Sequence, residues 1–190
     1  MIEVLRAGLC DLVMDLGRPG LGALGVPVGG AADPAALAAA NHLVGNDGSA
    51  AGLEITLSGP VLCFPAGGVA ALTGARFVAG AAVAWNETLV LAAGETLSLG
   101  QAQDGCRCWL ALRGGLAVPQ VMGSRSTFLP AGFGGHRGRA LKGGDALPCA
   151  PGAGEVRLLR AQPPSSEPDA PLRVVAGPQA GLVDDAGLAV

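Results

Sequence analysis

The sequence contains little charge, a single lysine and no tyrosine. Asp, Glu, Lys and Arg together make up 14% of the 190 residues, whereas about 25% is normal for a soluble domain. The net charge is -3, and the sequence has no block of like charges and no basic stripe with interleaved aromatic residues. Nucleic acid and acidic membrane surfaces are therefore not expected as partners.

Long apolar runs and the features of a secretory leader are also missing. No 18-residue stretch is free of both charged and turn-forming residues. The first residues, Met-Ile-Glu-Val, lack the basic stretch and the apolar run of a signal peptide. These absences predict a cytoplasmic protein with no membrane partner.

The five cysteines are odd in number and widely spread, which argues against a disulfide framework in a chain of this size. We expect reduced thiols in the core, with Cys106 and Cys108 on the same face of a strand. The sequence has only two histidines, so no metal site is expected. His42 is interpreted as a capping or surface group near the end of a helix.

Half of the residues are hydrophobic (50%), and 32 glycines and 14 prolines divide them into short runs. Runs that recur about every 8 to 12 residues between turn signals are typical of a β-sandwich or barrel. The expected fold class is therefore mostly β. Strands are predicted at residues 2–5, 9–14, 53–57, 61–64, 69–73, 82–85, 88–91, 96–99, 106–112, 146–149 and 156–160, with a hairpin turn at 85–88.

One short helix is predicted, over residues 34–44. Asp33 can cap it, Pro34 suits the first helical position, and good helix formers continue to Gly45. The preceding residues 17–30 contain six glycines and two prolines, which excludes a regular element there. Long irregular loops in compact domains are often functional.

The chain is expected to contain three parts. Residues 1–161 would form one β-rich domain. Residues 162–171 include four prolines and no large apolar side chain, which is typical of a linker. Residues 172–190 would begin a second half, opening with a strand at 172–175.

Polar side chains gather in residues 124–127 and 136–139. The first segment places three hydroxyl groups around a guanidinium, and the second adds an imidazole and two more guanidinium groups. Arginine holds carboxylates and phosphates by two-point contacts, and hydroxyl groups and loop amides supply neutral donors. This pattern favours an anion or carboxylate pocket. The alternative is that these groups satisfy buried loop carbonyls and pair with Asp145 or Glu54.

The same choice applies to Asp15 and Arg18. They either orient a small polar substrate in the loop or close the loop by an internal ion pair. For Glu54, the alternation of apolar and polar residues in 53–57 favours a solvated position over a buried acid with a raised pKa.

Six ordered segments carry a resemblance to a known family. They are Asp-Leu-Gly-Arg-Pro-Gly at 15–20, Gly-Val-Pro-Val-Gly-Gly-Ala-Ala-Asp-Pro at 25–34, Ala-Asn-His-Leu-Val-Gly-Asn at 40–46, Leu-Glu-Ile-Thr-Leu-Ser-Gly-Pro at 53–60, Ala-Leu-Thr-Gly at 71–74, and Gly-Ser-Arg-Ser-Thr at 123–127 with Phe-Gly-Gly at 133–135. Together they resemble the biotin-dependent carboxyltransferase family. That family includes the C subunit of 5-oxoprolinase (the KipA type) and allophanate hydrolase subunit 2, and is related to the carboxyltransferase part of urea carboxylase.

The resemblance implies a cyclophilin-like β-barrel and a subunit of a larger complex. Its implied partners are the A subunit of 5-oxoprolinase and the B subunit, which is a Kip-type inhibitor-like protein. The implied reaction is the ATP-dependent opening of 5-oxoproline to glutamate, or carboxyl transfer between biotin and urea. ATP would act in the complex and no cofactor would be bound covalently. Biotin would enter only through a partner, because Lys142 lacks the Met-Lys-Met setting of a biotin acceptor.

The matching segments supply the candidate site residues. The candidate catalytic residues are Ser124, Arg125 and Ser126. The candidate contacts to a small amide substrate are Asp15, Arg18, Gly29, Gly30, Asn41, His136 and Arg137. An arginine with hydroxyl and amide donors can hold a carboxylate or stabilise an oxyanion.

The sequence departs from the family pattern in two respects. Met14 stands where family members usually have Gln before Asp15, and family members continue into a second half that residues 175–179 resemble only at its start. Three interpretations stay open. The chain is a catalytic subunit that contributes to a shared site, or it is a binding subunit without chemistry of its own that controls a Kip-type partner, or an inactive fragment.

Overall fold

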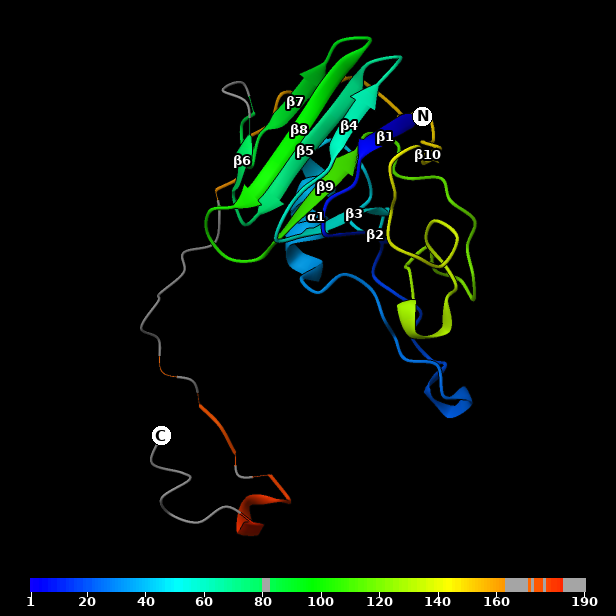
Figure 1. The fold of residues 1–190 in the computed structure, drawn as a ribbon, viewed down its shortest axis with the longest axis vertical. Coiled ribbons are helices and arrows are strands. Elements are labelled where there is room, and N and C mark those ends of the chain that lie inside the picture. Colours follow the sequence, from blue (N-terminus) through cyan, green and yellow to red (C-terminus); the bar gives the residue numbers. More distant parts are fainter. Residues whose placement is uncertain (80–82, 163–170, 172, 176, 183–190) are drawn as a thin grey trace.

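The computed structural model describes residues 1–79, 83–162, 171, 173–175 and 177–182, and these residues form two antiparallel sheets of five strands and one α-helix (Figure 1). The mostly-β class is confirmed. The first sheet contains β1 (Ile2–Arg6), β4 (Val61–Phe64), β6 (Phe77–Ala79), β8 (Glu95–Ala102) and β10 (Ala146–Leu147) in the order β10-β1-β4-β8-β6. The second contains β2 (Cys10–Met14), β3 (Gly52–Thr56), β5 (Gly68–Gly74), β7 (Thr88–Leu91) and β9 (Arg107–Leu112) in the order β2-β3-β9-β5-β7.

Alternating side chains of both sheets form one hydrophobic core. Leu53 and Ile55 of β3 belong to it, as do Leu97 and Leu99 of β8, and all four are buried. Successive side chains of a strand point to opposite faces, so one in two reaches the core. The sheets meet at a corner where Ser58, just after β3, forms a bridge with Gln101 of β8.

The helix α1 (Pro34–Leu43) covers the outer face of the second sheet and is confirmed to within one residue. Asp33 accepts a hydrogen bond from the Ala36 amide at 2.9 Å, which satisfies one of the free donors of the first turn. Leu37 packs with Trp109 of β9, and Leu43 packs with small side chains of β5 and β9. The second sheet is therefore covered on both faces.

This covering explains why the prediction of a solvated Glu54 is wrong. Glu54 alternates with the core residues of β3, so its side chain lies on the face that α1 and the chain before it cover. The residue is only 5% exposed. One carboxylate oxygen accepts a hydrogen bond from the Ala32 amide at 2.7 Å, and the other lies 3.3 Å from the Arg107 guanidinium.

Several predicted strands differ from the structure. Of the segment predicted at 82–85, residue 82 lies outside the described residues and 83–85 are irregular, so the predicted hairpin at 85–88 does not form. Instead β7 pairs with β5, and β6, which the sequence did not indicate, lies between them in the chain. Residues 156–160 form no strand, although Arg160 forms an isolated bridge with Glu87. Residues 173–175 of the strand predicted at 172–175 are also irregular.

The cysteine predictions are met in part. All five thiols are free, but only Cys108 is buried, whereas Cys106 is exposed. Cys106 precedes β9 and lies in the turn that leads to it, so the two residues do not share a strand face as expected.

Long loops lie beside the sheets and form the rest of the molecule. Residues 15–31 form an arm that extends away from the sheets, with the short 3-10 helix η1 (Gly22–Leu24) near its tip (Figure 1). Residues 113–145 contain only the short helix η2 (Leu129–Ala131). A third short helix, η3 (Ala180–Leu182), lies near the C-terminus. Among the described residues, no helix has the length and apolar character needed to cross a membrane. Most of the expected linker at 162–171 lies outside the described residues.

Candidate functional site

Asp15 connects the arm to the loop that carries Ser124, Arg125 and Ser126. Its carboxylate accepts hydrogen bonds from both serine hydroxyl groups at 2.6 Å and from the Arg125 amide at 2.6 Å. A fourth donor is the Gly17 amide at 2.8 Å. Both serines are fully buried. The hydroxyl protons of Ser124 and Ser126 are therefore engaged inside the protein, with Asp15 and not with the loop carbonyls, Asp145 or Glu54 that the structural alternative named.

These contacts set the charge of Asp15. Burial raises the pKa of its carboxyl group, but the hydrogen bonds from Ser124, Ser126 and two amides outweigh burial, and the net effect is a lowered pKa. Asp15 is therefore a buried anion with four donors. A buried carboxylate that accepts four hydrogen bonds in this way has a structural role, because it holds its donors in place.

Arg18 is buried, and its side chain contacts the segment 113–145. It is 2% exposed. Its guanidinium donates hydrogen bonds to the carbonyl oxygens of Ser126 and Val121, and it lies 5.0 Å from the centre of the Phe133 ring. The described residues contain no Arg18–Asp15 salt bridge, so the expected internal ion pair is wrong.

Backbone hydrogen bonds close the arm in place of that ion pair. The Arg18 amide donates to the Val28 carbonyl at 2.7 Å, and the Ala31 amide donates to the Asp15 carbonyl at 2.9 Å. Gly29 and Gly30 lie between these bonds, at φ values of 60° and 99° that favour glycine. A side chain on Gly30 would meet the Leu16 backbone. These two glycines let the legs of the arm approach each other.

A groove with a volume of about 520 Å³ lies beside this network. Val118, Val121 and Phe133 form part of its wall, and residues 132–138 form one of its sides. Two arginines of the predicted site, Arg125 and Arg18, contact residues of this wall. The Arg125 guanidinium donates to the Val118 carbonyl at 2.9 Å, and Arg18 contacts Val121 and Phe133 as described above.

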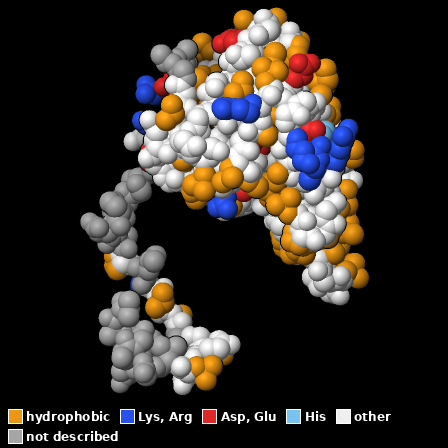
Figure 2. Space-filling view, viewed as in Figure 1, with side chains coloured by type: hydrophobic (Ala, Val, Ile, Leu, Met, Phe, Trp, Pro, Cys, Tyr) orange, Lys and Arg blue, Asp and Glu red, His pale blue; other side chains and the backbone are white. Residues whose placement is uncertain are grey.

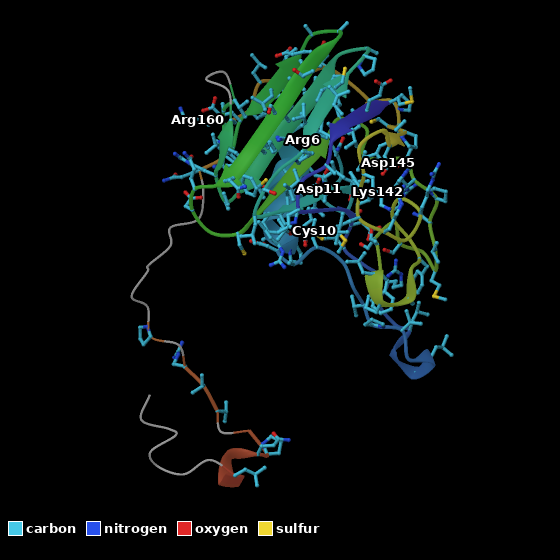
Figure 3. All side chains as sticks on the ribbon, in the orientation of Figure 1. Arg6, Cys10, Asp11, Lys142, Asp145 and Arg160 are labelled. Carbon is cyan, nitrogen blue, oxygen red and sulfur yellow. The ribbon has the colours of Figure 1, made fainter. Side chains whose placement is uncertain are left out.

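His136 and Arg137 both line the groove. The Nε2 atom of His136 lies 3.2 Å from Asp145 Oδ1. Asp145 also accepts two hydrogen bonds from Arg139, at 2.7 and 2.8 Å, and one from the Lys142 amide at 2.7 Å. The pKa of Asp145 is lowered, chiefly by the hydrogen bonds from Arg139, so Asp145 is ionised at neutral pH. Figure 2 shows basic side chains gathered around an acidic and a histidine side chain, and Figure 3 labels Lys142 and Asp145 on these loops.

Asn41 lies apart from the groove. Its amide donates to the Ala50 carbonyl at 2.8 Å, and its carbonyl oxygen accepts from Asn46 at 3.0 Å. Asn41 is fully buried and holds the turn that follows α1. His42 is exposed at the same end of the helix, as expected.

The structure thus brings most of the predicted residues into one region with different roles. Asp15, Arg18, Arg125 and the two serines form a buried network, and His136 and Arg137 face the groove. One alternative was that the polar groups of this region pair with Asp145 or Glu54. This is confirmed for Asp145, which pairs with His136 and Arg139, whereas Glu54 pairs with Arg107 outside this region. The apolar wall residues were missed, because isolated valines in a loop carry no periodic signal. Among the described residues, no three His, Cys, Asp or Glu side chains are close enough to hold a metal ion.

The sequence matches the model of a known family. The model is described as "Carboxyltransferase domain, subdomain A and B", and it matches residues 24–190.

Individual relatives are similar over most of this chain. The C subunit of 5-oxoprolinase from Escherichia coli (strain K12) is 46% identical over 151 residues, which are 78% of this chain and 49% of that protein. The urea amidolyase of Saccharomyces cerevisiae is 38% identical over 150 residues, or 77% of this chain and 8% of that protein. The crystal structure of Kluyveromyces lactis urea carboxylase superposes with a TM-score of 0.75 at 41% identity, over 78% of this chain and 14% of that one. The matched region thus spans about half of the E. coli protein and a small part of the others.

Proposed function

The chain belongs to the carboxyltransferase domain family, subdomains A and B, and from this membership we propose that it acts as a subunit of an ATP-dependent 5-oxoprolinase, which opens 5-oxoproline to glutamate. The observation that carries the proposal is the 46% identity with the C subunit of a 5-oxoprolinase over 151 residues. The proposed partners are the A subunit of such an enzyme, together with its Kip-type inhibitor-like B subunit. We place the complex in the cytoplasm, with ATP bound in the assembly and no covalent cofactor on this chain.

The geometry of the groove supports this proposal. Hydrolysis of a cyclic amide such as 5-oxoproline needs donors that hold the anionic substrate in place and a group that can protonate the leaving nitrogen. Residues 132–138 supply loop amides, and His136 lies in the same groove with Asp145 beside it. Arg125, Ser124 and Ser126 would act by holding the wall of the groove, since their contacts are with Val118 and Asp15.

A second candidate function is carboxyl transfer between biotin and urea. Its support is the 38% identity with a urea amidolyase and the 41% identity with a urea carboxylase structure. Biotin would then be carried by a partner, as Lys142 has no acceptor setting. A regulatory subunit without chemistry remains the alternative to both, and the burial of Ser124 and Ser126 favours it over direct catalysis by these two serines.

Reconstitution distinguishes these functions. The chain is co-expressed with the two candidate partner proteins, and glutamate release from 5-oxoproline is measured with and without ATP. The proposal predicts ATP-dependent release that requires this chain. Carboxyl transfer predicts activity with urea and a biotin-carrying partner instead. A complex that forms normally but gives neither product supports the regulatory alternative.

Arg125 gives a residue-level test within the same assay. Arg125→Ala removes the hydrogen bond to Val118, so activity should fall while the complex still assembles. Arg160→Ala is the matched control, because its side chain is 82% exposed and lies on the opposite side of the sheets (Figure 3). Equal activity of the Arg125 variant and the unmodified chain would contradict a role of Arg125 in the site.

A further inference from the structure

The groove beside residues 132–138 has the size and lining of a small-molecule site. Its volume is about 520 Å³, within the range of roughly 300 to 1,000 Å³ that is typical of ligand pockets. Its lining includes the apolar side chains of Val118, Val121 and Phe133 but no acidic residue. An anion in this groove would therefore meet no carboxylate in the lining.

Three backbone amides of the groove are without partners. The N–H groups of Gly134, His136 and Arg137 donate to no described residue, whereas the Gly135 amide donates to the Arg125 carbonyl at 3.0 Å. Gly134, Gly135 and Arg137 have positive φ values of 71°, 52° and 59°. Amides of successive residues in such turns form concave sites that bind anions.

The charges around these amides favour an anionic ligand. Arg137 is exposed and lines the groove, and no salt bridge among the described residues uses its guanidinium. Asp145, which lies beside His136, is already paired with Arg139 through two hydrogen bonds. The charge of Arg137 is therefore left uncompensated at the groove.

We propose that this groove is a carboxylate-binding site, in which the amides of Gly134, His136 and Arg137 and the Arg137 guanidinium hold the carboxylate of a small molecule. The apolar wall of Val118, Val121 and Phe133 contacts the aliphatic or ring part of the same ligand. The ligand class is thus a small carboxylate with a compact apolar body. The assignment of 5-oxoproline as this ligand rests on the proposed function, but the carboxylate class does not.

Direct binding to the full chain tests the site without any turnover. Amide chemical shifts are followed by NMR during titration with 5-oxoproline and, in parallel, with 2-pyrrolidinone, which has the same ring without the carboxylate. We expect 5-oxoproline to shift the amides of Gly134, His136 and Arg137 and 2-pyrrolidinone to leave them unchanged. Equal shifts with both compounds, or shifts confined to other residues, would overturn the proposal.

Variants of Arg137 define the charge requirement. Arg137→Ala should raise the Kd for 5-oxoproline about tenfold, which is the loss expected for one charged donor at an accessible site. The Kd of Arg137→Lys should lie between those of Arg137→Ala and the unmodified chain. The exposed Arg160→Ala is the control and should bind as the unmodified chain does. Unchanged affinity of Arg137→Ala would contradict the assigned contact.

Inorganic phosphate is the second probe, because the same donors could hold a phosphate. Tighter binding of phosphate than of 5-oxoproline at these amides would overturn the carboxylate assignment. Failure of the function and failure of the site remain distinguishable. If the complex releases no glutamate but the carboxylate still shifts these amides, the site stands and the proposed function fails. If glutamate is released but these amides do not shift, the function stands and the site is wrong.

Discussion

Asp11 of β2 places a carboxyl group in the core of the protein. The residue is 1% exposed, its Oδ2 atom accepts a hydrogen bond from the Gly8 amide at 2.6 Å, and its Oδ1 atom has no partner among the described residues. Figure 3 labels it close to the edge of the second sheet. Burial raises its pKa from 3.8 to about 6, because the ionised form loses its hydration in the interior.

This shift predicts a pH-dependent stability. A folded-state pKa above the unfolded value means that the native state binds the proton more tightly, so stability is full below pH 4 and falls as the pH rises through 6. The loss is about 3 kcal/mol for a shift of this size. Asp11→Asn should keep an acceptor for the Gly8 amide and be more stable than the unmodified chain at pH 7.5, with the difference disappearing at about pH 3, below the unfolded pKa. Urea denaturation at both values measures this.

The exposed Asp104→Asn is the control for Asp11, because the Asn side-chain oxygen can still accept the hydrogen bond that the Arg76 amide donates to Asp104. It should change the free energy of unfolding by less than about 0.5 kcal/mol at either pH, as surface substitutions generally do. A constant difference between Asp11→Asn and the unmodified chain across the pH range would show that ionisation of Asp11 does not cause the effect.

Single residues also show how far the site could be predicted from sequence. The density of hydroxyl groups and arginines correctly marked one region of the molecule. It did not reveal that Asp15 takes both serine hydroxyls, because a carboxylate 109 positions away in the chain can only be matched to Ser124 once the fold is known. For the same reason the direction of Arg18, toward carbonyl oxygens and the Phe133 ring, was missed.

Among the elements, the arm depends on a glycine at its base. Gly17 has φ 86°, and a side chain there would lie 2.4 Å from the Val28 carbonyl that the Arg18 amide bonds to. Gly17→Ala should therefore break the pairing of the legs. Hydrogen exchange at Arg18 and Ala31 should become at least about tenfold faster, because these amides lose the protected geometry.

Gly20→Ala separates backbone strain from this steric effect. Gly20 has φ 85°, nearly the same as Gly17, but no atom lies within 4 Å of the position that a side chain would take. It should cost only about 1 kcal/mol of backbone strain and leave exchange at Ala31 slow. Similar exchange in both variants would mean that the contact with Val28 does not hold the arm.

The helix and strands were predicted correctly where local sequence signals and tertiary packing favour the same structure. The Asp-Pro start of α1 and the apolar runs of β4 and β7 were predicted to within a residue. The segment 156–160 has an apolar pattern but gains only one isolated bridge, between Arg160 and Glu87, and its backbone contacts with this edge of the sheet are confined to residues 86–88. Pairing partners decide such cases, and local sequence patterns do not specify them.

At the scale of the whole molecule, the hydrophobic core is complete before the last part of the chain begins. All buried core residues of the described part lie between Ile2 and Leu147. The following segment adds contacts at the surface. The Thr88 amide donates to the Leu159 carbonyl at 2.9 Å, Arg113 donates to the Gly154 carbonyl at 2.6 Å, and Ala161 packs against the cluster that contains Leu43. Residues 153–161 therefore act as a strap across β7 and the end of α1.

Two shortened chains test this arrangement. A chain that ends at Gln162 keeps the strap and should melt within about 1 °C of the full chain. A chain that ends at Gly152 loses the strap, and two or more hydrogen bonds of about 1 kcal/mol each should lower Tm by about 5 °C in a domain of this size. Thermal unfolding followed by circular dichroism measures both. Equal melting of the two shortened chains would mean that residues 153–161 do not stabilise the fold, and a collapse of the longer one would place necessary contacts beyond Gln162.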